Sequence, residues 1–80
     1  MNKELIQEKI ADIIKNEMGF TSNADFYSAH FINDFGMNSL DIVELTVLTE
    51  RVFKIYIDDE SALEIRKVNE LVNFVHLKID

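Results

Sequence analysis

Apolar residues recur with a helical period in the first segment of the chain. They are Leu5, Ile6, Ile10, Ile13 and Ile14. Polar and charged residues occupy the remaining positions, which is the pattern of an amphipathic helix. Asn2 is a residue type that caps helix N-termini, and Gly19 is a natural C-terminal stop. The pattern therefore predicts a first helix from about Lys3 to Met18.

The segment between Gly19 and Asn38 has no such period, and it is longer than the usual connection between packed helices. It nevertheless contains several large aromatic residues, namely Phe20, Phe26, Tyr27, Phe31 and Phe35. Because disordered segments are poor in aromatic residues, we expect an ordered crossover whose aromatic side chains anchor it to the core. A short helical turn is expected near Asp25 to Ala29.

A second helix is predicted to begin at Asn38 or Ser39 and to end at about Phe53. Asp41 follows Asn38 by three residues, which resembles a capping box with Asp in place of Glu or Gln. A broad apolar stripe of this helix is expected to face the core, and it consists of Ile42, Leu45, Leu48, Val52 and Phe53. A smaller stripe lies on nearly the opposite side among charged residues, and it consists of Leu40, Val43 and Val47. The smaller stripe either packs under the long loop or stays exposed for a partner.

Apolar and polar residues alternate over positions 53–57, which alone would suit a strand. No second alternating run exists to pair with it, so we predict no strand there. Asp58 begins a short third helix that ends at about Glu64. A last helix is predicted from the spacing of Val68, Leu71, Val72, Val75 and Leu77. The expected fold is therefore a small all-α bundle of four helices, one of them short, with a long first crossover loop.

The composition limits the chain to one small domain, residues 1–80. The chain has 80 residues, 15 acids, 8 bases and a net charge of -7. The absence of Cys excludes a disulfide scaffold, a thiolate nucleophile and a Cys-based zinc site, and it favours a cytoplasmic location. No apolar run approaches the length of a membrane span, so no membrane insertion is expected. The negative charge disfavours nucleic acid and favours basic protein partners.

Catalytic and metal-binding patterns find little support. His30 and His76 are far apart in sequence and belong to no nucleophile motif, so we predict loop or surface histidines and no enzyme. The carboxylates at positions 58–60 could hold a hard cation weakly, but they lack the alternation and glycine of a calcium loop. Helix capping explains them more simply, and no metal site is predicted.

Ser39 lies at the expected start of the second helix, where unpaired backbone N–H groups favour a phosphate ester. By position alone, an ordinary first-turn or capping residue is the simpler interpretation. The surrounding sequence adds a second signal. Residues 34–45 read DFGMNSLDIVEL, and residues 50–60 read ERVFKIYIDDE.

These two stretches resemble the acyl carrier protein family. Its pattern is Leu-Gly-x-Asp-Ser-Leu-Asp-x-Val-Glu-Leu, with a later Glu-x-x-Phe-x-Ile-x-Ile-x-Asp. The match continues without a gap into the last helix and covers about half of the chain strongly, whereas the first helix agrees in pattern only. The resemblance implies that Ser39 takes a 4'-phosphopantetheine arm from coenzyme A through a separate magnesium-dependent holo-synthase, a phosphopantetheinyl transferase. It also implies that acyl intermediates are held as thioesters on the thiol of the arm. A chain without Cys fits this chemistry, because the arm supplies the thiol.

The resemblance further implies a docking face on the second helix. By position the matching acids are Asp41, Glu44 and Glu50, with Val43 and Val47 as apolar contacts between them. Such a face suits a monomeric shuttle that binds acyl-processing enzymes through their basic docking surfaces. A solvated helix face remains the alternative for each acid.

Three residues depart from the family pattern. Asn38 stands where most members have Asp, Arg51 replaces an acid, and Asp58 stands where many members have Pro. Fatty acid biosynthesis is the first expectation for the pathway. A dedicated carrier of a specialised lipid, polyketide or aminoacyl pathway is the alternative, and an unmodified acidic helical adaptor is the alternative from another class.

Overall fold

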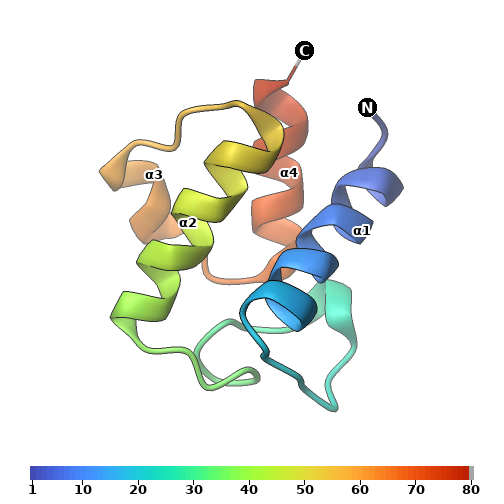
Figure 1. Cartoon of the computed structure of the whole chain (residues 1–80), viewed down its shortest axis with the longest axis vertical. Coiled ribbons are helices and arrows are strands. Elements are labelled where there is room, and N and C mark those ends of the chain that lie inside the picture. The colour runs from blue at the N-terminus through green and yellow to red at the C-terminus, as the bar shows by residue number, and fades with distance from the viewer. Residues whose placement is uncertain (80) are drawn as a thin grey trace.

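A computed structural model describes residues 1–79, so Asp80, the last residue of the predicted domain, lies outside the described residues. The elements follow in the order α1 (Lys3–Asp12), the π-helical turn η1 (Ile13–Glu17), the 3-10 turn η2 (Phe26–Ser28), α2 (Ser39–Phe53), α3 (Asp59–Glu64) and α4 (Val68–Lys78). Residues 1–79 contain no strand, and the predicted all-α fold of four helices is confirmed (Figure 1).

The first helical stretch has the predicted bounds, but its last turn is π-helical. The Asn2 side-chain oxygen accepts the Leu5 N–H at 2.8 Å, as expected of an N-cap. Helical structure continues through η1 to its C-cap at Met18. Gly19 follows with a φ of 78°, a left-handed conformation that glycine adopts without a steric penalty. This glycine therefore ends the helix where the sequence predicted.

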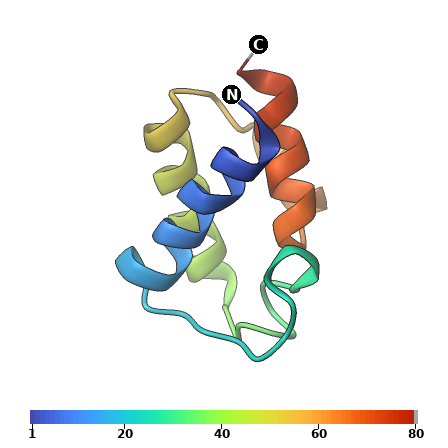
Figure 2. The same cartoon turned by 90° about the vertical axis from the view of Figure 1, so that its right-hand side faces the viewer.

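The crossover is ordered, and its aromatic side chains enter the core. Phe31 and Phe35 are buried, and the Phe26 ring meets the Phe35 ring edge to face at 6.0 Å between centroids. The predicted short turn is η2, with Asp25 as its N-cap. Backbone hydrogen bonds tie the crossover to the connection before α4, from the Phe31 N–H to the Arg66 carbonyl at 2.9 Å and from the Val68 N–H to the Ala29 carbonyl at 3.1 Å. As Figure 2 shows, the crossover closes the end of the bundle opposite both termini.

The core lies mainly between the first helical stretch, the crossover and α4. α1 packs against α4, η1 contacts α2, and η2 contacts α4. The α4 residues Val68, Leu71, Val72 and Val75 are buried as predicted. Leu77 lies in the predicted helix, but its side chain is 79% exposed. Leu77 follows Val75 by two residues, which places it on nearly the opposite side of a helix.

The helix α2 begins with the predicted capping box and buries most of the predicted face. The Asp41 N–H donates to the Asn38 side chain, and the Asn38 N–H donates to the Asp41 carboxylate, each at 2.9 Å. Its core face includes the buried residues Leu45 and Phe53, with Ile42 and Leu48 packed against the core.

One core assignment in α2 was wrong, because Val52 is 41% exposed. Thr49 is buried instead, on the row of residues spaced by four that also contains Leu45 and Phe53. The Thr49 hydroxyl donates to the Leu45 carbonyl at 2.7 Å. A threonine can therefore replace an apolar residue in this row, because its polar atom is satisfied within the helix.

Lys54 closes α2 in the left-handed conformation, with φ 56° and ψ 48°. Because a Cβ atom is crowded in this conformation, Lys54→Gly should raise the free energy of unfolding by about 0.5–1 kcal/mol. Urea unfolding of the variant checks this, with Lys54→Ala as the control that keeps the Cβ atom and should show no such gain. Equal stabilities of the Gly and Ala variants would contradict the prediction.

Asp58 caps α3, and its carboxylate accepts the Ser61 N–H at 3.1 Å. Hydrogen bonds from the hydroxyl and the N–H of Ser61 lower the pKa of Asp58 below its ordinary value. A lowered folded-state pKa adds stability that is present above the ordinary aspartate pKa, about 3.9, and is lost as the pH falls through the lowered value.

Asp58→Asn should therefore reduce the loss of stability as the pH falls from about 5 through the lowered pKa, because Asn still caps but does not titrate. Urea unfolding across this range measures the effect. Asp59→Asn, one residue beyond the cap, serves as the matched charge control. A pH profile of Asp58→Asn identical to that of the wild type would exclude the capping carboxylate as a source of acid sensitivity.

Candidate functional site

Ser39 is the first residue of α2 and its side chain is exposed. The Asn38 side chain satisfies the N–H of Asp41. Helix geometry leaves the N–H groups of Ser39 and Leu40 without acceptors inside the helix, and they carry the positive end of the helix dipole. The structure thus places a hydroxyl group beside unpaired amides, as the sequence predicted.

An open groove of about 840 Å³ borders Ser39 between α2 and the segment that contains α3. The apolar lining from α2 consists of Ile42, Val43 and Val47, and that from the facing segment of Tyr56, Ile57, Ala62, Leu63 and Ile65. Phe31 and Ile32 of the crossover complete this apolar lining. A concave apolar site with a few polar groups is typical of small-molecule binding.

A small void of about 10 Å³ lies next to this groove. Its wall includes the buried side chains of Leu45 and Leu71, and it shares Phe31, Ile42, Thr46, Ile57, Ala62 and Ile65 with the groove. The groove and the core are therefore separated only by these shared side chains.

The smaller apolar stripe of α2 is exposed and does not pack under the long loop. Leu40 is 78% exposed and Val43 is 59% exposed, whereas Val47 is partly covered. Leu63 of α3 and Tyr56 are also largely exposed at the groove. An apolar patch of this kind on a small protein marks a surface for binding a ligand or a partner.

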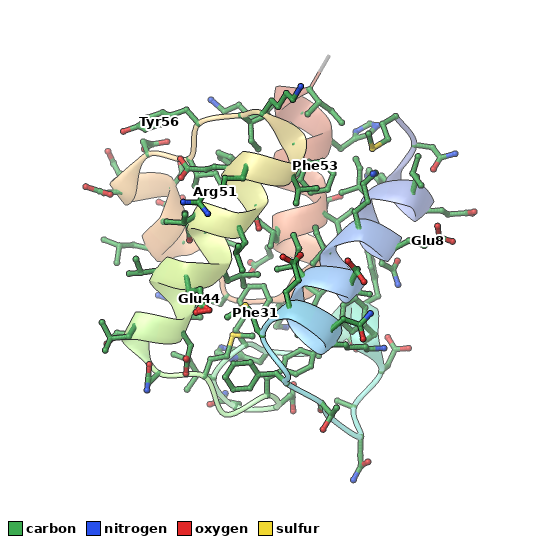
Figure 3. The ribbon with its side chains drawn as sticks, in the orientation of Figure 1. Glu8, Phe31, Glu44, Arg51, Phe53 and Tyr56 are labelled. Carbon is green, nitrogen blue, oxygen red and sulfur yellow. The ribbon has the colours of Figure 1, made fainter. Side chains whose placement is uncertain are left out.

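The predicted docking acids differ in their surroundings. Glu44 is exposed, and Figure 3 shows it on the same outward side of α2 as Arg51. Glu50 is half-buried, and its carboxylate accepts the Ile57 N–H at 2.9 Å. The Asp41 carboxylate belongs to the capping box. Two of the three acids therefore also stabilise the fold, and only Glu44 is held by none of the hydrogen bonds found within residues 1–79.

The histidines are not brought together into a site. The Nδ1 atom of His30 accepts the N–H groups of Ile32 at 3.1 Å and Asn33 at 3.2 Å, so this side chain supports a turn of the crossover. His76 lies in the last turn of α4. The part of the chain that the structure describes contains no group of three His, Cys, Asp or Glu residues that could hold a metal ion. Across residues 1–79, every helix is too short or too polar to cross a membrane.

Several groove residues were not predicted as part of the site. They include Ile32, Tyr56, Leu63, Ile65 and Arg66. The sequence contains one signal for Leu63 as a binding residue. It is a large apolar residue in a short acidic helix that buries none of its residues. The other residues join the groove through the path of the loops, which hydrophobic periodicity does not report.

Comparison with known proteins shows the family of this chain. Residues 5–75 match the family model described as a phosphopantetheine attachment site. An acyl carrier protein of Guillardia theta is 37% identical over 99% of this chain and 98% of its own length. One of Cyanidium caldarium is 38% identical over 100% of this chain and 93% of its own length.

A solved structure agrees as well. The acyl carrier protein of Thermotoga maritima superposes with a TM-score of 0.84 at 28% identity, over 99% of this chain and 92% of that one. Members of this family are carriers rather than enzymes, and they work with a phosphopantetheinyl transferase and with acyl-processing enzymes. The chain therefore belongs to the acyl carrier protein family and carries a covalently attached 4'-phosphopantetheine.

Proposed function

We propose that Ser39 is the attachment residue and that this chain shuttles acyl intermediates on the arm it carries. The supporting observation is the position of Ser39, an exposed hydroxyl at the start of α2 on the edge of an apolar groove. Ser39 is the only serine that lines this groove. The phosphate of the arm would lie beside the N-terminal amides of α2, which favour an anion.

The residues present fit both the arm and its cargo. The arm supplies the thiol that forms the thioester, and the chain supplies an apolar surface next to it. Each methylene group removed from water is worth about 0.8 kcal/mol. An acyl chain of several carbons therefore prefers the apolar groove to water.

The proposed docking face consists of Asp41, Val43, Glu44, Val47 and Glu50. Exposed apolar residues next to an exposed acid suit a basic docking surface, because complementary charge speeds association while a small contact allows rapid release. The protein is proposed to be a cytoplasmic monomer that forms one acyl-carrier domain over residues 1–80.

The proposed pathway is fatty acid biosynthesis. The apolar lining of the groove suits a plain hydrocarbon chain. A dedicated carrier of another pathway is the second candidate, and the exposed Arg51 favours it, because a base among the docking acids selects different partner surfaces.

One experiment tests the attachment site and the pathway in sequence. The purified protein is incubated with coenzyme A, magnesium and a broad-specificity phosphopantetheinyl transferase. Peptide mass spectrometry should locate one arm on the peptide that contains Ser39. The product is then offered to reconstituted fatty acid elongation enzymes, which should extend an acyl chain on it. An arm on another residue would overturn the assignment, and a correctly loaded protein that is not elongated would favour the dedicated carrier.

A further inference from the structure

The groove beside Ser39 contains one permanently cationic side chain, that of Arg66. No other Lys or Arg lines it, although the chain has 8 such residues. The remaining ionisable lining residues are His30, Glu50, Tyr56 and Asp59. Arg66 is therefore the side chain in the groove best suited to bind an anion.

The backbone of Arg66 is fixed close to the segment that leads into α2. Its carbonyl accepts the Phe31 N–H at 2.9 Å, and the Phe31 carbonyl accepts the Met37 N–H at 3.1 Å. Met37 is two residues before Ser39. On the other side, the Glu70 carboxylate accepts the N–H groups of Arg66 at 2.9 Å and Lys67 at 3.0 Å. Glu70 therefore holds the backbone of Arg66 in place, and the residue itself is exposed.

We propose that Arg66 binds the phosphodiester of the arm and thereby holds the arm along the groove. This inference rests on the proposed attachment to Ser39. The phosphodiester is anionic at every physiological pH, and guanidinium groups bind phosphate oxygens in a bidentate manner. Arg66 and the N-terminal amides of α2 would then contact the same anion from the two sides of the groove.

The test uses holo protein, prepared with coenzyme A and a phosphopantetheinyl transferase and verified by intact mass. The variants are Arg66→Gln, the conservative Arg66→Lys, and Lys67→Gln as the matched control. Lys67→Gln removes the same charge at the next residue, whose side chain does not line the groove. Phosphorus NMR reports the environment of the phosphodiester directly, and the difference in melting temperature between the holo and apo forms reports binding of the arm to the fold.

In Arg66→Gln, the phosphorus resonance should move towards that of free phosphopantetheine and become narrower, while Lys67→Gln should match the wild type. The stabilisation that accompanies attachment of the arm should shrink in Arg66→Gln and be partly retained in Arg66→Lys. The loss should correspond to a two- to fivefold weaker association of the arm, about the effect of one exposed charge pair. In 1 M NaCl the wild type should resemble Arg66→Gln, because the Debye length falls to about 3 Å.

A merely structural role of Arg66 would lower the apo and holo melting temperatures equally and would leave the phosphorus resonance unchanged. That result would overturn the proposal. Equal effects of Arg66→Gln and Lys67→Gln would also overturn it, because they would indicate the general field of the protein and not a contact. Failure of the proposed function would appear earlier and separately, as the absence of the arm from Ser39 in the intact-mass measurement.

Discussion

Ser39→Ala is expected to gain no phosphopantetheine under conditions that convert the wild type completely to a form with one arm. The variant lacks the only side-chain oxygen that the start of α2 presents at the edge of the groove. Intact-mass spectrometry after incubation with coenzyme A, magnesium and a phosphopantetheinyl transferase measures the result. We expect a complete loss of modification and not a reduced rate.

The Ser39→Ala variant should remain folded, because the capping bonds at the start of α2 come from Asn38 and Asp41. Circular dichroism and thermal melting check this. Ser61→Ala is the matched control, since Ser61 also lies in the first turn of a helix but does not line the groove. This control should be modified as fast as the wild type. Modification of Ser39→Ala, or its loss in Ser61→Ala, would contradict the proposed attachment site.

The helices could be predicted from sequence because their determinants are local. Asn2, Asn38 and Asp58 cap the helices that they precede, and Gly19 ends the first helical stretch. Capping requires only a side chain within three residues of the amide that it satisfies. The bounds of the helices can therefore be predicted from short segments of the sequence.

The buried faces were less predictable, because burial depends on what packs against each helix. Val52 and Leu77 are apolar residues within well-formed helices, yet both are exposed. Thr49 is polar and buried, because its hydroxyl bonds within its own helix. Periodicity gives the approximate direction of a face, but it does not determine which of two neighbouring rows meets the rest of the protein.

The candidate site was predictable only in part for a similar reason. Ser39 belongs to a continuous motif at a helix start, so the sequence alone indicated it. The groove combines residues from the crossover, α2, α3 and the connection before α4, and Arg66 enters it through backbone pairing with Phe31. Such a surface exists only after the tertiary contacts have formed, and no local pattern marks it.

Reversal of one charge on α2 is expected to give the second-largest effect. Glu44→Lys should slow modification by the phosphopantetheinyl transferase by about tenfold at low ionic strength, because the variant replaces attraction to a basic surface by repulsion. Folding should be almost unchanged, since an exposed single charge contributes less than about 1 kcal/mol. Glu44 is suited to this test because, within residues 1–79, its carboxylate caps no helix and bonds to no backbone amide, unlike those of Asp41 and Glu50.

The matched control for this reversal is Glu8→Lys, which makes the same change of net charge on the exposed side of α1 (Figure 3). The initial rates of modification of the two variants should differ at low salt. They should become similar near 1 M NaCl, where charges are screened beyond about 3 Å. Arg51→Glu should have the opposite effect to Glu44→Lys, because it removes the one base from the docking acids. Equal slowing by Glu8→Lys and Glu44→Lys would mean that net charge alone governs association. An unchanged rate for Glu44→Lys at low salt would mean that the transferase does not contact this face of α2.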